Sequence, residues 1–348
     1  MNTLARYIRI ALGAYLKSPV IGPYSVQLGL SDACNYRCIM CNIFSAESAG
    51  SYTSNGKTLM EFDTAKKLIL SLSKIGTRTI NFCGYGETLL FPRLKEIVAI
   101  TKQAGLQAAI TTNGQLLTRP MIDDLSALKL DELYISLNAA TEKTYTRIHK
   151  GCKENDFPRI VEMAAYAQSK NIRVTVTFVI MSLNYREIDA FISAAKRLKI
   201  PEIIFRELGT RFLLDTSLAL SVQEKELLKK HPCINEARIR HNLGQLIKTL
   251  DHEKKEGVDC FAGYVGGTII TADGSVFACC NCNTPVGNVY HNDFAEIWNN
   301  QAYRKFRHEG QLMHGRTRYP EGCLCATCPT HVLNARLQQI LYPWRKTC

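Results

Sequence analysis

The chain has 348 residues, 46% hydrophobic and 21% charged, with a formal net charge of +12. The length allows roughly two domains with a sizeable core, and the composition is that of a soluble globular protein without low-complexity tracts. A basic excess can indicate nucleic acid, an anionic membrane surface or acidic substrates. Lys and Arg are spread along the chain without a block of five or more, which argues against nucleic acid as a partner.

The first predicted element is an amphipathic helix over residues 4–17. Arg6 and Arg9 interrupt its apolar character, so it is neither a signal peptide nor a membrane span. We interpret it as a helix that caps the end of a barrel, and contact with a membrane surface is the alternative. The apolar residues at helical spacing are Leu4, Ile8, Ala11, Leu12 and Tyr15.

Three cysteines, Cys34, Cys38 and Cys41, follow a strand predicted over 25–30. Thiolates select Fe–S clusters, zinc or copper(I), and most such sites take four protein ligands. Three ligands on a four-iron cube would leave one iron open for a substrate or cofactor. A structural zinc knuckle, or buried thiols that happen to cluster, is the alternative.

From residue 25 to about residue 206, strand and helix patterns alternate. Six such units predict an α/β fold with a parallel sheet and right-handed crossovers. The predicted strands are 25–30, 79–83, 107–111, 132–136, 173–180 and 202–206. The helical runs between them are 61–74, 93–104, 119–129, 141–148, 157–170 and 185–198.

Polar motifs follow three of these strands, and with the cysteine spacing they resemble the radical S-adenosylmethionine (SAM) enzymes. The resemblance implies a partial (β/α)6 barrel, whose chemistry collects at the carboxyl ends of the strands. It also implies a 4Fe–4S cluster on Cys34, Cys38 and Cys41, whose open iron holds the SAM amine and carboxylate. An electron from the cluster would cleave SAM to a 5′-deoxyadenosyl radical, and an external donor of the flavodoxin or ferredoxin type would supply it.

The stretch Gly84-Tyr85-Gly86-Glu87 looks like the Gly-Gly-Glu motif of that family. Gly84 and Gly86 would allow a close backbone approach to the ligand, and the Glu87 carboxylate would suit the methionyl ammonium of SAM. Alone, such a turn after a strand is common. Met40 stands where the family usually has an aromatic residue near the adenine, and a thioether can also cover a ring face.

The resemblance assigns further SAM contacts after the next two strands. Asn113, in Thr111-Thr112-Asn113-Gly114, and Ser136 would contact the ribose. Arg147 would bind the carboxylate through its bidentate guanidinium, although a solvated helix face is the alternative.

Residues 207–259 change character, with polar helical runs at 221–230 and 234–254 and no strand signal. We interpret them as a helical bridge over the barrel mouth, with Cys233 as an ordinary buried thiol. The predicted domains are 1–24, 25–206, 207–259 and 260–348.

A second cysteine set lies in residues 260–348. Four features of this part resemble the SPASM/twitch extension. They are Cys260, a predicted hairpin with Asp273-Gly274 as its turn, a helix opening at 294–299 and a closing Cys-x2-Cys pair. The resemblance implies one auxiliary 4Fe–4S cluster; the longer SPASM form with two clusters, or a zinc site, is the alternative. The implied ligands are Cys260, Cys279, Cys325 and Cys328, which leaves Cys280, Cys282, Cys323 and Cys348 spare.

The fourteen cysteines fall mostly in groups, and the chain lacks a secretion signal. We therefore expect metal sites rather than disulfides, and a cytoplasmic location.

The reaction predicted from these residues is hydrogen abstraction from a small molecule such as a sugar, polyol or aminocyclitol, leading to oxidation or epimerisation. Cys280 would donate a hydrogen atom, because strand alternation would point it away from a cluster on Cys279; a spare ligand or a structural thiol is the alternative. A peptide-modifying enzyme is the second hypothesis, weakened because only 24 residues precede the first strand. A non-catalytic Fe–S or zinc module is the third.

Overall fold

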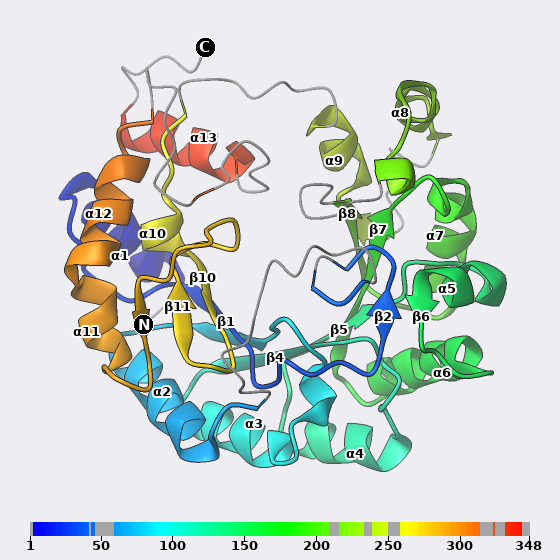
Figure 1. Cartoon of the computed structure of the whole chain (residues 1–348), viewed down its shortest axis with the longest axis horizontal. Helices are drawn as coiled ribbons and strands as arrows, with labels where there is room; N and C mark the ends of the chain where they lie inside the picture. The colour runs from blue at the N-terminus through cyan, green and yellow to red at the C-terminus, as the bar shows by residue number, and fades with distance from the viewer. Residues whose placement is uncertain are drawn as a thin grey trace.

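A computed structural model gives the fold of the chain (Figure 1). It describes residues 3–41, 43–45, 59–208, 216–232, 239–249, 258–313, 323 and 331–342. Among the helices in these ranges, none combines the length and apolarity that crossing a bilayer requires.

A curved sheet forms the centre of the molecule, with strand order β12-β11-β10-β1-β3-β4-β5-β7-β8-β9. From β1 to β8 every neighbouring pair is parallel. The predicted parallel α/β architecture is therefore confirmed. These six strands are β1 (Ser25–Leu28), β3 (Thr79–Phe82), β4 (Gln107–Thr112), β5 (Glu132–Ser136), β7 (Arg173–Ile180) and β8 (Glu202–Glu207).

Six helices lie along the outer side of this curve (Figure 1). They are α2 (Phe62–Lys74), α3 (Leu94–Gln103), α4 (Arg119–Ala127), α5 (Glu142–Ile148), α6 (Asp156–Ser169) and α7 (Ile188–Arg197). Two short 3-10 turns, η1 (Thr88–Leu90) and η2 (Tyr185–Glu187), precede α3 and α7. The crossover helices end within a few residues of their predicted bounds.

Alternation along the strands separates the two faces of the sheet. In β3, Ile80 and Phe82 are fully buried against the helices, whereas Thr79 and Asn81 are half-buried on the inner face. The Thr111 hydroxyl donates a hydrogen bond to Asn81 Oδ1 at 3.1 Å across this inner face. The inside of the barrel is therefore polar.

The C-terminal part continues the same sheet. β10 (Gly266–Ile270) pairs in parallel with β1, and β11 (Ser275–Phe277) and β12 (Gly287–Asn288) follow in antiparallel order. The predicted hairpin is confirmed, and Gly274 adopts a φ of +82° at its turn. The helices of this part are α10 (Ala262–Val265), α11 (Phe294–Asn299), α12 (Gln301–Gly310) and α13 (His331–Leu341).

The predicted bridge differs from expectation in one respect. It contains η4 (Thr216–Leu218), α8 (Val222–Lys229) and α9 (Leu243–Thr249), but also β9 (Arg240–His241), which pairs in parallel with β8. The prediction of an uninterrupted helix over 234–254 and of no strand was wrong, because a two-residue strand leaves no alternation to detect. Cys233 lies outside the described residues.

The N-terminal helix is present as α1 (Thr3–Tyr15), but it is held by an unexpected face. Ile10 and Ala14 are buried in a cluster with Phe261 and other C-terminal residues. Ile8 and Tyr15, which belong to the predicted apolar face, are each 58% exposed. The helix therefore packs through a side that was not predicted to be apolar, and Ile8, Leu12 and Tyr15 face outward.

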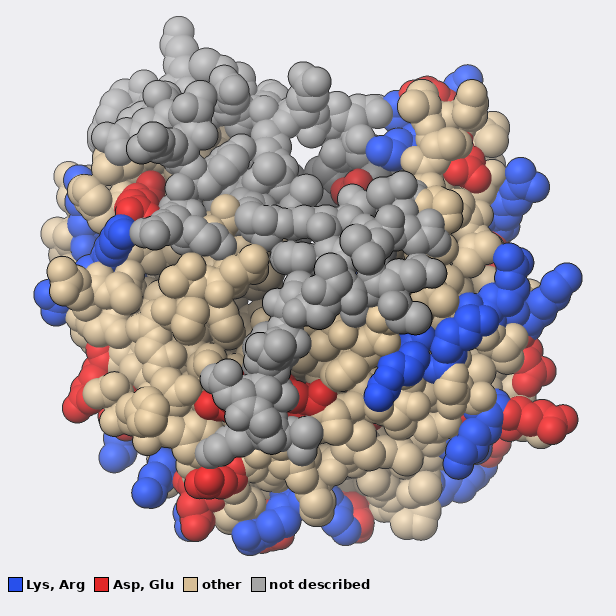
Figure 2. Space-filling view, viewed as in Figure 1, with Lys and Arg blue, Asp and Glu red and all other residues tan. Residues whose placement is uncertain are grey.

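The charges are distributed over the surface rather than collected on one element. Figure 2 shows Lys and Arg side chains in a row over the side where α5 and β6 (His149–Lys150) lie, and elsewhere mixed with Asp and Glu. Ion pairs such as Arg119 with Glu162 at 2.7 Å join several of them.

Candidate active site

The sequence motifs gather where the parallel strands end. The cysteine loop follows β1, Gly84–Glu87 follows β3, Thr112 ends β4 and Ser136 ends β5. The carboxyl ends of parallel strands share one edge, so these segments meet at one mouth of the barrel.

The turn after β3 holds the start of the cysteine loop. The Gly86 amide donates to the Ser31 carbonyl at 3.2 Å, and the Glu87 amide donates to the Ala33 carbonyl at 2.8 Å. A Cβ on Gly84 would lie 2.5 Å from Gly29 Cα, and one on Gly86 would lie 2.2 Å from the Ala33 oxygen. The close approach that these glycines permit is to the chain itself.

Glu87 links this turn to the end of β4. Its buried carboxylate accepts hydrogen bonds from the Leu89 amide (3.0 Å), the Thr112 hydroxyl (2.6 Å) and the Asn113 amide (2.8 Å). Burial raises the pKa of Glu87, and these donors oppose that shift. A carboxylate offers about four acceptor positions, so one is left for another donor. Its predicted contact with the SAM ammonium stays a prediction.

The middle of the cysteine loop pairs with the segment after α5. β2 (Arg37–Cys38) and β6 form a two-stranded antiparallel ladder in which Cys38 lies opposite His149. Cys38 Sγ lies 3.1 Å from His149 Nδ1. Burial lowers the pKa of His149 to about 4, so its ring is neutral near pH 7. Sequence reasoning missed this residue because two-residue strands carry no periodic signal.

A network of side-chain hydrogen bonds also holds the start of the cysteine loop. Asn35 accepts from the Asn113 side chain at 2.8 Å and donates to Gln115, which donates to Asp156 at 2.8 Å. The Tyr36 hydroxyl also donates to Asp156, at 3.0 Å. Burial alone would raise the pKa of Asp156, but the donors around it lower the pKa below its ordinary value. Asn113 thus orients the loop, and its predicted ribose contact stays a prediction.

The three thiols of the loop fit an iron–sulfur cluster. Burial raises the pKa of Cys34 and of Cys38, and the nearby Cys41 raises both further. Such thiols ionise readily only when a cation replaces the proton. In the described ranges, no three His, Cys, Asp or Glu side chains converge on one point as a single metal ion requires. A 4Fe–4S cube binds each thiolate through a separate iron, so three thiols can hold such a cluster without converging on one point.

Met40 and Ile39 pack in a hydrophobic cluster at the mouth. The cluster also contains Val179 of β7, Met181 directly after β7 and Leu218 of η4. The residue before the third cysteine therefore packs in a cluster with residues of the bridge, and its predicted place near the adenine of SAM stays a prediction.

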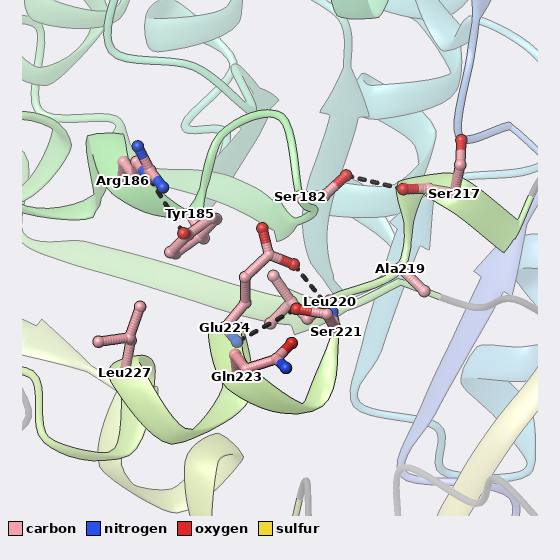
Figure 3. Close-up of a pocket in the computed structure, with 10 residues that line it drawn as sticks. All are labelled: Ser182, Tyr185, Arg186, Ser217, Ala219, Leu220, Ser221, Gln223, Glu224 and Leu227. Carbon is pink, nitrogen blue, oxygen red and sulfur yellow. Dashed lines mark hydrogen bonds between the residues drawn. The ribbon is translucent and has the colours of Figure 1, made fainter.

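An open pocket adjoins this cluster (Figure 3). It encloses about 660 Å³ between the loop after β7, η4 and the start of α8. Ala219 lines the pocket and packs against the Met40 cluster. The Ser182 hydroxyl donates to the Ser217 carbonyl at 2.9 Å, and the Arg186 guanidinium donates to the Tyr185 hydroxyl at 3.0 Å. Sequence reasoning gave no residue of this pocket.

Ser136 and Arg147 have different positions. Ser136 lies half-buried at the end of β5, where its hydroxyl accepts from Thr177 at 3.4 Å. Arg147 is exposed on α5, while the next two residues, Ile148 and His149, are buried. The predicted carboxylate contact of Arg147 stays a prediction.

The auxiliary cysteines are described only in part. Cys260 is buried, and its amide donates to the Gly310 carbonyl at 2.8 Å. Cys279 is buried just beyond the end of β11. Cys325 and Cys328 lie outside the described residues.

The alternation argument for Cys280 was wrong. β11 ends at Phe277, and the Cys282 amide donates to the Cys279 carbonyl at 3.1 Å in a turn. A hydrogen bond with the Cys280 side chain, together with burial, raises the pKa of Cys279. The two thiols therefore lie together rather than on opposite sides, and the donor role of the exposed Cys280 stays a prediction.

Cys282 and Cys323 are joined by a disulfide across an isolated antiparallel bridge. For this pair the expectation of metal ligation or spare thiols instead of disulfides was wrong. The physical reason is the bridge, which brings two segments 41 residues apart into contact.

Comparison with known proteins agrees with this arrangement. Residues 28–195 match the model of the radical SAM superfamily, and residues 260–329 match that of an iron–sulfur cluster-binding domain, SPASM.

Three relatives illustrate the range of similarity. The PqqA peptide cyclase of Xanthomonas oryzae pv. oryzae is 25% identical over 88% of this chain and 80% of its own length. The tungsten-containing aldehyde ferredoxin oxidoreductase cofactor-modifying protein of Pyrococcus furiosus is 24% identical, covering 81% of this chain and 82% of its own. The structure of anSMEcpe with bound AdoMet and a peptide has a TM-score of 0.63 at 15% identity, covering 92% of this chain and 100% of that chain. The structural likeness establishes the fold.

Proposed function

Because the chain belongs to the radical SAM superfamily and carries a SPASM iron–sulfur domain, we propose that it uses SAM to modify a peptide. The observation that carries the enzymatic role is the cysteine loop, held at the mouth of the barrel by the β2–β6 ladder and the Gly84–Glu87 turn. Cys34, Cys38 and Cys41 would hold a 4Fe–4S cluster, which supplies the electron that cleaves SAM to a 5′-deoxyadenosyl radical.

The residues of the chain position the reactants. Glu87 keeps one acceptor position for a cationic group, and the Met40 cluster offers an apolar wall. The polar inner face, including Asn81, Thr111 and Cys83, would hold the group that loses hydrogen. An external electron donor of the flavodoxin or ferredoxin type completes the proposal.

The peptide substrate is supported by the PqqA peptide cyclases, which match 88% of the chain. In a solved structure with the same fold a peptide is bound. The pocket beside the mouth has room for residues that flank the reacting one. These findings favour a peptide over the sugar, polyol or aminocyclitol that was the first expectation. Oxidation, epimerisation and ring closure all remain open to the same radical.

The first experiment tests SAM cleavage. Anaerobically reconstituted protein with dithionite and SAM is expected to form 5′-deoxyadenosine, measured by chromatography. The Cys38→Ala variant should form none, because the cluster loses one of its three ligands. If wild-type protein with full iron content forms no 5′-deoxyadenosine, the enzymatic proposal is wrong.

The second experiment tests the substrate class. Short peptides encoded beside the gene and a panel of sugars and aminocyclitols are compared as accelerators of 5′-deoxyadenosine formation. A peptide should accelerate it and lose two hydrogen atoms on oxidation or ring closure, or keep its mass on epimerisation. Acceleration by a sugar or aminocyclitol alone would contradict the peptide proposal.

A further inference from the structure

We propose that His149 donates a hydrogen bond from Nδ1 to the Cys38 thiolate of the loaded cluster and thereby raises the reduction potential of that cluster. The inference rests on the cluster assignment of the proposed function. Its geometric basis is the direct opposition of Cys38 and His149 in the β2–β6 ladder, with Sγ and Nδ1 3.1 Å apart.

His149 is rigidly placed for this role. Its ring is 1% exposed and stacks on Tyr145, with ring centroids 4.3 Å apart. The Ile39 amide donates to the Ile148 carbonyl at 3.0 Å, which fixes the ladder next to the ring. A side chain held in this way keeps its distance to the sulfur without paying for ordering.

The other ring nitrogen has a partner for either tautomer. His149 Nε2 lies 3.1 Å from the Leu137 carbonyl, an acceptor, and 3.4 Å from Asn138 Nδ2, a donor. Asn138 has a backbone φ of +57°. Its side chain is held by the Val179 amide, which donates to Oδ1 at 2.8 Å. The ring can therefore carry its proton on either nitrogen without leaving Nε2 unpaired.

Iron binding decides between the two tautomers. With Cys38 as a thiol, its S–H donates to Nδ1, and Nε2–H donates to the Leu137 carbonyl. A metal-bound cysteine has lost its proton, so its sulfur can only accept. With the ring proton on Nδ1 the ring donates to this sulfur, while Nε2 accepts from Asn138 and no longer donates to the Leu137 carbonyl. The thiol proton leaves with iron binding.

The consequence is electrostatic. A hydrogen bond to a cluster sulfur stabilises the reduced cluster, which is the more negative form, and so raises its potential. His149 is a positioning residue that acts through Cys38, since its contact is with the ligand and not with the substrate.

The test measures the potential rather than the activity. Four proteins are reconstituted: wild type, His149→Phe, His149→Asn and Tyr145→Phe. EPR-monitored titration measures the midpoint potential of the cluster on Cys34, Cys38 and Cys41 in each. The Phe variant should bind iron but be reduced only at a more negative potential. Asn, whose side-chain nitrogen can occupy the place of Nδ1, should restore most of the shift. Tyr145→Phe keeps the stacked ring and should leave the potential unchanged.

A spectroscopic readout identifies the contact directly. Wild-type protein labelled with 15N-histidine should show a weak nitrogen coupling and an exchangeable proton coupling to the reduced cluster by pulsed EPR, both absent in His149→Phe. Equal potentials in wild type and the Phe variant would overturn the proposal, as would a strong coupling typical of nitrogen bound to iron. If the Phe variant binds no iron, the Asn variant decides. An intact cluster near the wild-type potential supports the proposal, and loss of iron there too overturns it. If the protein binds the cluster but does not cleave SAM, the proposed function is wrong, whereas the potential measurement still tests the role of His149.

Discussion

Glu87 illustrates how one side chain can serve both structure and ligand. Its carboxylate accepts three hydrogen bonds from the chain, two of them at the end of β4. The family resemblance predicted a direct contact with SAM and did not predict these internal partners. A substitution there must therefore be read through stability and affinity together.

We expect Glu87→Gln to lower the free energy of unfolding by about 1–3 kcal/mol, because the amide cannot accept from all three donors and one buried N–H loses its partner. If the remaining acceptor position faces the SAM ammonium, the affinity for SAM should also fall. Urea unfolding and SAM titration measure the two effects. Thr112→Val removes one donor and keeps the charge, so it should lower stability while leaving SAM affinity unchanged. A SAM affinity in Glu87→Gln equal to that of wild type would show that Glu87 stabilises the turn and does not contact SAM.

The difference in stability between wild type and Glu87→Gln should depend on pH in a definite direction. The native pKa of Glu87 is raised above 4.5, so the native state binds this proton more tightly than the unfolded state. Its contribution to stability is present at low pH and is lost as the pH rises through the native pKa. The stability advantage of wild type over the non-titrating Gln variant should shrink as the pH rises through that range.

At the level of residues, sequence reasoning found the groups whose place follows from the end of a strand. Cys34, Gly84 and Glu87 come directly after predicted strands, so the fold itself brings them together. His149 could not be found in this way, because it lies beside Cys38 only through the pairing of two two-residue strands, which leave no periodic signal in the sequence. Cys280 was misjudged because strand alternation was extended past Phe277, where the strand ends.

Among the elements, α1 departs most from expectation. The apolar spacing of Ile8, Leu12 and Tyr15 predicted a buried face, yet these residues are exposed. The helix is held through Ile10 and Ala14 instead. Periodicity identifies the helix but not which face finds a partner, because that depends on residues far along the chain. Contact of the exposed stripe with a membrane surface stays a prediction.

The orientation of α1 can be tested by a matched pair of substitutions. Ile10→Ala should lower the free energy of unfolding by roughly 2–4 kcal/mol, because Ile10 is 4% exposed and its removal leaves a cavity. Ile8→Ala removes the same atoms from a residue that is 58% exposed and should change stability by less than about 0.5 kcal/mol. Urea unfolding gives both values. The reverse order would mean that the helix is rotated.

Over the whole molecule, one continuous sheet joins the barrel to the C-terminal part, since β10 pairs with β1. The six parallel strands were predictable because each carries its own hydrophobic pattern. The parallel pairing of β10 with β1 was not, because no local signal specifies a neighbour so far along the chain. Whether Cys325 and Cys328 complete the second site stays a prediction.

Iron content tests both sites at once. Anaerobically reconstituted protein should hold about eight irons per chain, as two 4Fe–4S clusters. The Cys34→Ala/Cys38→Ala/Cys41→Ala variant should keep about four, and a variant with Cys260 and Cys279 changed to Ala should also keep about four. Chemical iron analysis decides. A wild-type content near twelve would indicate the two-cluster SPASM form, and no change in either variant would contradict the ligand assignment.

The pairing of β1 with β10 also has a consequence for how the chain is made. Ser25 is synthesised more than two hundred residues before its partner Gly266. Until then the outer edge of β1 presents unpaired amides and carbonyls, as any open sheet edge does. A parallel contact between such distant segments also forms slowly. We therefore expect the nascent barrel to keep an open sheet edge until the last quarter of the chain is made, and the pairing with β10 then covers that edge.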